Sequence, residues 1–209
     1  MSAKLGEIIM AEERNTHVKM AMAEVLGLYM IAFVGIVVGC YGLKVFDGLG
    51  VIAAISLYLG IGLLVCTVIA FWNENLLLTG IFGILGIFLL SFQPMVVGAL
   101  AMGSMAAFGG DVTSAMVYMV FVGVLLLIMA LISMAQPVKM LPLLLIVGGL
   151  AFIFLGLWFN DFGTPKMDDY RMIVGVLWLL TGILATYMAA AITMLVMKGK
   201  PVLPLLISK

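Results

Sequence analysis

The sequence predicts an all-α membrane protein, a bundle of six transmembrane helices. Of its 209 residues, 66% are hydrophobic and only 10% are charged, and the mean hydropathy of +1.34 lies far outside the range of a soluble domain. The few charges leave uncharged runs that each supply the roughly 20 helical residues a bilayer core requires. The alternating ten-residue segments of an outer-membrane barrel are absent from the sequence, so the backbone must be satisfied within helices.

Each uncharged run gives one predicted helix, and short polar connections separate the runs. We expect a cytoplasmic N-terminal tail at 1–23, a membrane domain at 24–198 and a cytoplasmic C-terminal tail at 199–209. Lys and Arg are more frequent on the side that carries both tails, which places the N- and C-termini in the cytoplasm and the chain in the cell membrane as a multi-pass protein. The predicted spans lie near 25–43, 49–72, 76–97, 113–135, 140–159 and 172–197.

The segment 94–111 fits no simple class. Its apolar run continues past Pro94 with many small residues. It is either an interfacial segment after the third helix or a re-entrant loop, which is allowed only where protein or water covers the backbone. The sequence assigns it no role.

The predicted spans contain no Asp, Glu, His, Lys or Arg, whereas pumps and proton relays place such groups within the bilayer. Asp47 and Arg171 are assigned to solvated loops. No nucleophile with a base and no Cys/His cluster occurs on a span, so we expect no enzyme, no cofactor and no metal site. The net charge of zero gives no electrostatic reason to bind nucleic acid. Trp72 and Trp158 stand where an aromatic belt would lie.

The first predicted helix carries a smooth face interrupted by one branched side chain, Ile31. At about 100° per residue, four glycines fall on that side of the helix. Either a neighbouring helix approaches closely there, as small residues allow, or the face lines a pore. Both roles remain open for Gly27, Gly35, Gly39 and Gly42.

The last helix runs through Tyr187 into a specific terminal motif. That motif consists of Gly199, Lys200, Val202, Leu203 and Pro204. The stretch resembles the end of the acetate uptake transporter family, which includes the succinate-acetate permeases, where Tyr-Leu-Ala leads into Gly-Arg-x-Val-Leu-Pro. "VYMVFVGVLLLIM" in the fourth helix and "VLGLYM" at the start of the first are similar to the same family, and the resemblance covers roughly 25–205.

The resemblance implies six helices per protomer, assembly as a homo-oligomer, specifically a hexamer, and an anion path through each protomer. It also implies a hydrophobic constriction, with Ile31, Ile84 and Val147 at the positions of the family's bulky residues. Asn75 and Thr79 remain from the family's polar start to the third helix and are candidates for polar pore lining. The sequence reveals no convincing set of donors for a desolvated carboxylate, which needs them.

We therefore expect a channel or transporter that passes acetate or similar small monocarboxylates through a hydrophobic constriction. Two alternatives stay open. One is a channel for small neutral solutes such as urea, amides or gas. The other is a structural membrane subunit that transports nothing, and lipid is the only partner that all three share.

Overall fold

The fold is given by a computed structural model of the chain. It describes residues 23–48, 50–101, 112–136, 138–161, 167–199 and 202–204. The first helix spans Ala23–Gly42, and it is followed by α2 (Gly50–Trp72), α3 (Leu76–Ala101), α4 (Val112–Ser133), α5 (Met140–Asn160) and α6 (Met167–Lys198). The predicted all-α, six-helix fold is confirmed.

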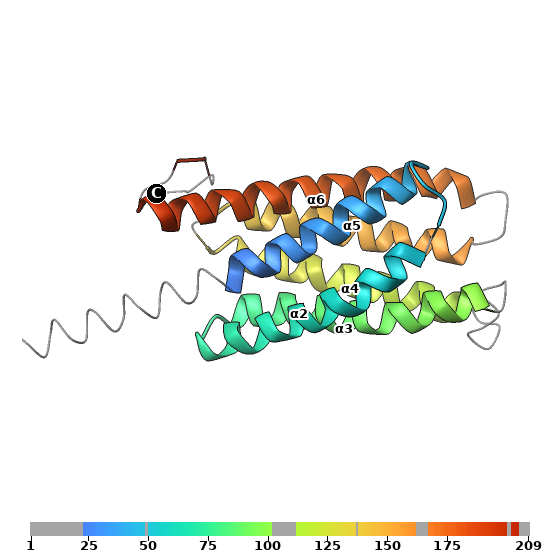
Figure 1. Cartoon of the computed structure of the whole chain (residues 1–209), viewed down its shortest axis with the longest axis horizontal. Coiled ribbons are helices and arrows are strands. Elements are labelled where there is room, and N and C mark those ends of the chain that lie inside the picture. Colours follow the sequence, from blue (N-terminus) through green and yellow to red (C-terminus); the bar gives the residue numbers. More distant parts are fainter. Residues whose placement is uncertain are drawn as a thin grey trace, which may run out of the picture.

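The helices lie side by side in an elongated bundle (Figure 1). Within the described residues, five are long and apolar enough to cross a membrane, and the part of α3 at Leu76–Phe92 is a shorter apolar helix. The chain is thus a multi-pass membrane protein, as predicted. The first helix begins at the end of the bundle where α6 finishes (Figure 1). The cytoplasmic location of that end stays a prediction.

Two helix ends differ from the predicted spans. Helix α3 continues to Ala101, beyond the expected end near 97, and it includes Pro94, which transmembrane helices tolerate. The rest of the segment 94–111, residues 102–111, lies outside the described residues. Helix α6 begins at Met167 and not near 172, because acidic residues suit the positive end of a helix dipole. Arg171 therefore belongs to a helix, and its assignment to a loop is wrong.

Glycines set the closest helix contacts. Helices α2 and α3 meet at Gly60 and Gly86, where a Cβ built on Gly60 would lie 3.1 Å from the carbonyl oxygen of Gly86. Helices α4 and α5 meet at Gly123 and Gly149, where a Cβ on Gly123 would lie 2.7 Å from the carbonyl oxygen of Gly149. Without Cβ atoms the backbones approach and pack over a large area, which is how helices associate when lipid removes the hydrophobic driving force.

The terminal motif folds back onto α6. Gly199 follows the last helical residue with φ of +65°, the left-handed conformation that suits glycine at a helix end. Beyond it, the Tyr187 hydroxyl donates a hydrogen bond to the Pro204 carbonyl oxygen at 3.0 Å, and Leu203 packs against the core. The structure thus brings Tyr187 into contact with the end of the terminal motif at Pro204. Lys200 lies outside the described residues, and Val202 is exposed.

Replacing Tyr187 with phenylalanine is expected to release this C-terminal segment without unfolding the bundle. The lost hydrogen bond is exposed, so the free energy of unfolding should fall by about 1 kcal/mol or less. Trypsin should cleave faster after Lys198. Tyr58→Phe on α2, where the side chain is 73% exposed, is the matched control, and equal cleavage rates in the two variants would contradict the role of the hydrogen bond.

Candidate functional site

The glycine face of the first helix is a contact surface for other helices. A Cβ on Gly35 would lie 2.7 Å from the Cα of Gly182 on α6. Gly39 and Gly42 meet the same helix at Leu179 and Gly175, and Gly27 lies against the Phe82 ring of α3. These contacts support the packing role for the face. Gly42 also lines one of the two cavities described below.

One cavity lies in the half of the bundle where the first helix begins. It offers about 40 Å³ to the centre of a water-sized sphere, and all six helices line it. We term it the leucine cavity, after residues such as Leu28, Leu126, Leu144 and Leu145. Thr181 is one of the few lining residues with a polar atom, and its hydroxyl already donates to the Leu177 carbonyl oxygen at 2.8 Å.

A second cavity follows along the same helices. It offers about 30 Å³ to the centre of a water-sized sphere, and it is lined from the first helix, α2, α3, α5 and α6. Arg171 stands in its lining, and we term it the arginine cavity. Its other lining residues with polar side-chain atoms are Tyr41, Ser56, Trp158 and Trp178. The surface of both cavities is almost wholly apolar, and of the two only the arginine cavity has a charged residue among its lining residues.

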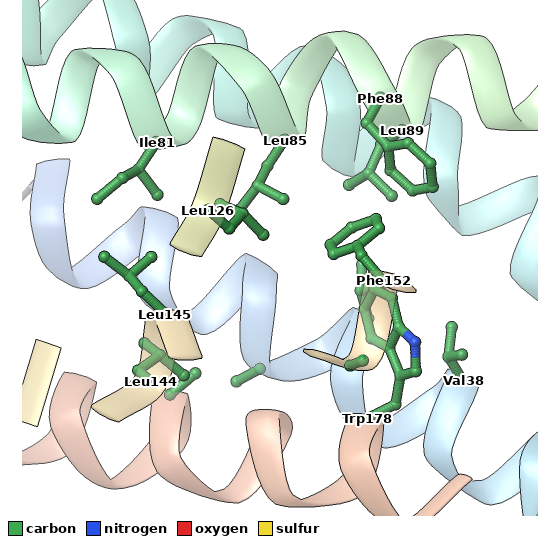
Figure 2. Packing of buried hydrophobic residues seen from close by; sticks show 14 of the residues in the cluster. Val38, Ile81, Leu85, Phe88, Leu89, Leu126, Leu144, Leu145, Phe152 and Trp178 are labelled. Atoms are coloured by element: carbon green, nitrogen blue, oxygen red, sulfur yellow. The ribbon is translucent and has the colours of Figure 1, made fainter. Parts of the chain in front are cut away.

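A shared wall separates the cavities. Val34, Phe88, Leu89 and Trp178 line both of them. Phe152 joins this wall by edge-to-face contacts, with its ring centroid 4.7 Å from that of Phe88 and 4.9 Å from that of Trp178. Figure 2 shows Phe152 between Phe88 on α3 and Trp178 on α6. Aromatic pairs of this geometry are favourable beyond the area they bury, so these ring contacts stabilise the wall between the cavities.

The predicted constriction residues do not all reach this region. Ile31 lines the leucine cavity, whereas Ile84 and Val147 line neither of the two cavities. The shared wall holds Val34 in place of Ile31 and Phe88 in place of Ile84, which is a displacement of about one helical turn on each helix. Trp178 on α6 lines both cavities, whereas Val147 on α5 lines neither.

Asn75 and Thr79 are engaged at the start of α3. The Asn75 side chain accepts a hydrogen bond from the Leu78 backbone N–H at 3.2 Å and donates one to the Glu24 carboxylate at 3.1 Å. The first of these bonds is that of a helix N-cap. The Thr79 hydroxyl donates to the Asn75 carbonyl oxygen at 2.8 Å. Neither residue lines either cavity.

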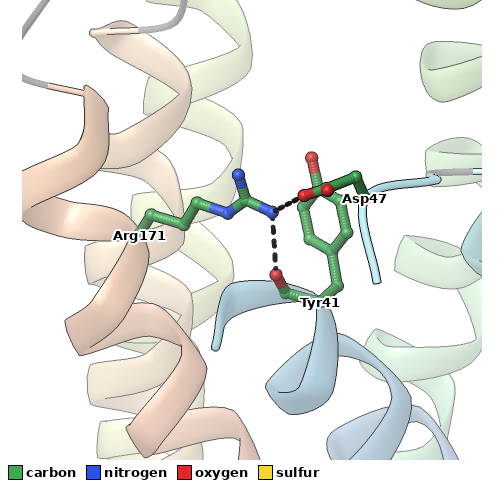
Figure 3. A network of polar contacts seen from close by, with 3 residues as sticks. All are labelled: Tyr41, Asp47 and Arg171. Carbon is green, nitrogen blue, oxygen red and sulfur yellow. Dashed lines mark hydrogen bonds and ion pairs between the residues drawn. The ribbon is translucent and has the colours of Figure 1, made fainter. Parts of the chain in front are cut away.

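Arg171 is the charged residue of the arginine cavity. Its Nη2 donates to the Tyr41 carbonyl oxygen and to the Asp47 carboxylate, both at 3.1 Å (Figure 3). The guanidinium carbon lies 4.7 Å from the centroid of the Tyr41 ring, a favourable cation–π contact. The Arg171 side chain is only 12% exposed, against 86% for Asp47. Sequence reasoning missed this site because the acidic stretch before Arg171 was expected to be a loop.

Residues that line this cavity carry buried N–H donors, among them Arg171 and Trp178 of α6. The Arg171 Nε and the Trp178 Nε1 are buried without a hydrogen-bond partner among the residues that the structure describes. In Figure 2 the indole nitrogen of Trp178 is directed toward Val38, which lines the arginine cavity. A signal for Trp178 was present in the sequence, because an indole N–H in the middle of an apolar span needs an acceptor.

The other two tryptophans differ in their surroundings. Trp72 is 77% exposed, whereas Trp158 is 3% exposed and lines the arginine cavity. The expectation that Trp158 belongs to an aromatic belt is wrong, because its ring packs edge to face on Tyr41 and Phe159. Among the described residues, no group of three or more His, Cys, Asp and Glu side chains could hold a metal ion.

Comparison with known proteins rests on the fold. No protein-family model and no curated protein matches the sequence. Among solved structures, the bacterial acetate channel SatP is similar with a TM-score of 0.75 over 89% of this chain and 98% of that chain, at 20% sequence identity. The resemblance predicted from the terminal motif is confirmed for the fold. With its six helices and cavities inside the bundle, this chain has the fold of the bacterial acetate channel.

Proposed function

We propose that this protein is a membrane channel for acetate or similar small monocarboxylates. The solute crosses the interior of the protomer through the arginine cavity, the shared wall and the leucine cavity in turn. The observation that carries the proposal is the succession of two cavities along one bundle, in a fold that is similar to an acetate channel.

The cavities suit solutes of a few heavy atoms. One water molecule needs roughly 10–15 Å³ of such space, and the two cavities offer about 30 and 40 Å³. A solute the size of acetate then requires only small movements of the lining side chains. Larger acids require the shared wall to open widely, which selects for short chains.

The lining of the leucine cavity sets the form in which the solute passes. An unpaired carboxylate is very costly in such surroundings, and the Thr181 hydroxyl is already bonded to a backbone carbonyl. The solute therefore passes the leucine cavity as the neutral acid. The shared wall is the constriction, and Ile31 lines the cavity beyond it. This replaces the ring of Ile31, Ile84 and Val147 as the proposed narrow point.

We further propose that the channel works as a homo-oligomer in the cell membrane, a hexamer by resemblance. The outer surface of the bundle suits contact with lipid and with neighbouring copies. Large apolar side chains such as Tyr58, Phe121 and Leu131 are 73%, 58% and 66% exposed, and a surface of this kind marks a membrane or protein contact.

The experiment is solute entry into liposomes that contain the purified full chain. We expect protein-dependent uptake of labelled acetate, faster at acidic than at neutral pH because the neutral acid crosses the leucine cavity. Urea-driven swelling without acetate uptake would replace the proposal with a channel for neutral solutes. No flux of either solute would overturn it in favour of a structural subunit.

A further inference from the structure

The arginine cavity is lined by residues that carry buried donors, and Arg171 and Trp178 are the ones on α6. Arg171 and Trp178 both line it, and the Nε of the first and the Nε1 of the second are buried without a hydrogen-bond partner in the described parts of the chain. They are seven residues apart on α6, which puts them on similar faces of the helix with a rise of about 10 Å between them. One donor thus stands at the loop-side mouth of the cavity and the other at the shared wall.

Apolar side chains make up most of the rest of the lining, which also includes Tyr41, Ser56 and Trp158. Val34, Val38 and Phe92 line the cavity and offer contact to a short alkyl chain. Buried N–H groups are costly to leave without an acceptor, and a guanidinium binds a carboxylate more strongly than it binds a neutral acceptor. The chemistry that fits each donor is therefore that of a small carboxylate, whose short alkyl part contacts the apolar side chains of the lining.

We infer that the arginine cavity binds a small carboxylate at two successive positions, first at Arg171, which captures the charged group, and then at Trp178, whose indole N–H donates to a carboxylate oxygen at the shared wall. The inference rests on the proposed function and deepens it, because it names the groups that select the solute before the constriction. Neutral solutes lack the charge that Arg171 binds, so they enter without this selection.

Asp47 competes with the solute for Arg171. Its carboxylate takes a hydrogen bond from Nη2 at 3.1 Å, and the Asp47 side chain is 86% exposed while that of Arg171 is 12% exposed. The arginine therefore keeps a fixed place while its acidic partner reaches it from the solvent side. When Asp47 loses its charge, the guanidinium stays at the cavity without its acidic partner, and it can bind the carboxylate of a solute more strongly.

If Asp47 competes with the solute, substitutions of Asp47 and of Arg171 should change the half-saturating acetate concentration in opposite directions. In liposomes, Asp47→Asn is expected to lower the acetate concentration that gives half-maximal uptake by about threefold, and Arg171→Gln is expected to raise it by about tenfold. A purely structural ion pair predicts the same direction for both variants, because each breaks the bond between the 43–48 connection and α6. Urea entry should not change in either variant, and two shifts in the same direction would overturn the inference.

A second experiment measures acetate binding at Trp178 independently of transport. The chain has three tryptophans, so full-length protein labelled with ¹⁵N at the indole nitrogens gives three N–H signals, and Trp178→Phe identifies the one from Trp178. Sodium acetate is expected to shift that signal in a saturable way, whereas sodium chloride at equal ionic strength and urea are not. No shift with acetate would overturn the inference.

The two experiments separate the two proposals. A saturable shift without acetate flux would refute the channel and retain the binding site. Flux whose half-saturating concentration is unaffected by Asp47→Asn, Arg171→Gln and Trp178→Phe would refute the binding site and retain the channel. Because Trp178→Phe keeps a ring at the wall, its effect reports the loss of the N–H group more than a loss of packing.

Discussion

Replacing Gly35 with alanine is expected to destroy the packing of the first helix on α6. The new Cβ would lie 2.7 Å from both the Cα and the N of Gly182, and backbone atoms cannot rotate away as the end of a side chain can. The two helices must move apart along their whole contact. We expect a loss of about 3 kcal/mol or more of the free energy of unfolding, measured as a fall in the thermal unfolding temperature in detergent.

Gly83→Ala is the matched control, since it makes the same chemical change on α3. Its Cβ would lie 3.4 Å from the Thr67 Cγ2 atom, an ordinary contact. Alanine favours the helix over glycine by up to about 1 kcal/mol, so this variant should be as stable as the parent protein or more stable. Equal losses at Gly35 and Gly83 would show that the close approach of the backbones does not govern stability.

Replacing Phe88 with alanine is expected to join the two cavities. Phe88 is 2% exposed, lines both cavities and stacks edge to face on Phe152. Its removal deletes much of the shared wall, and we expect acetate uptake per folded protein to rise at least about tenfold, which corresponds to roughly 1.4 kcal/mol off the barrier. Acids with longer chains should gain more than acetate.

Phe159→Ala on α5 separates this effect from general damage to the core. Phe159 is 3% exposed and lines neither of the two cavities. Both variants lose a buried ring, and each should cost about 3–5 kcal/mol of stability. Only Phe88→Ala should speed uptake. Similar uptake in the two variants would place the constriction somewhere other than the shared wall.

The helices were predictable from sequence because lipid imposes a simple rule on them. A backbone in hydrocarbon must satisfy its own hydrogen bonds, so the uncharged runs translate directly into spans. The helical period also predicts that one face of the first helix carries Gly27, Gly35, Gly39 and Gly42. Its partner was not, because Gly182 and Gly175 are 147 and 133 residues from Gly35 and Gly42 in the sequence, and nothing local couples them.

The position of the proposed constriction depends on helix rotation and register, which the sequence does not determine. Ile31 and Val34 are neighbouring apolar positions in sequence, and only the tilt of the first helix against α3 and α6 decides which of them meets Phe88. A family resemblance transfers a position to within about one turn at best. Trp178 adds a large ring from a helix that the resemblance did not implicate.

Arg171 was missed for a different reason. A cation next to several acidic residues suggests a solvated loop, and that interpretation is correct for most such stretches. Here the acidic residues begin helix α6, and the following turn carries Arg171 under the Tyr41 ring. Only the placement of the first helix against α6, which the glycines allow, turns a surface charge into a cavity lining.

The alkyl lining of the leucine cavity also bears on proton leakage through the proposed channel. Protons travel along unbroken files of hydrogen-bonded water, and a small cavity walled by hydrocarbon holds no such file. With the Thr181 hydroxyl turned back to its own helix, little in this lining could anchor one. In the proposed channel, protons therefore cross only as part of the neutral acid, one with each molecule, and free protons do not leak through the same passage.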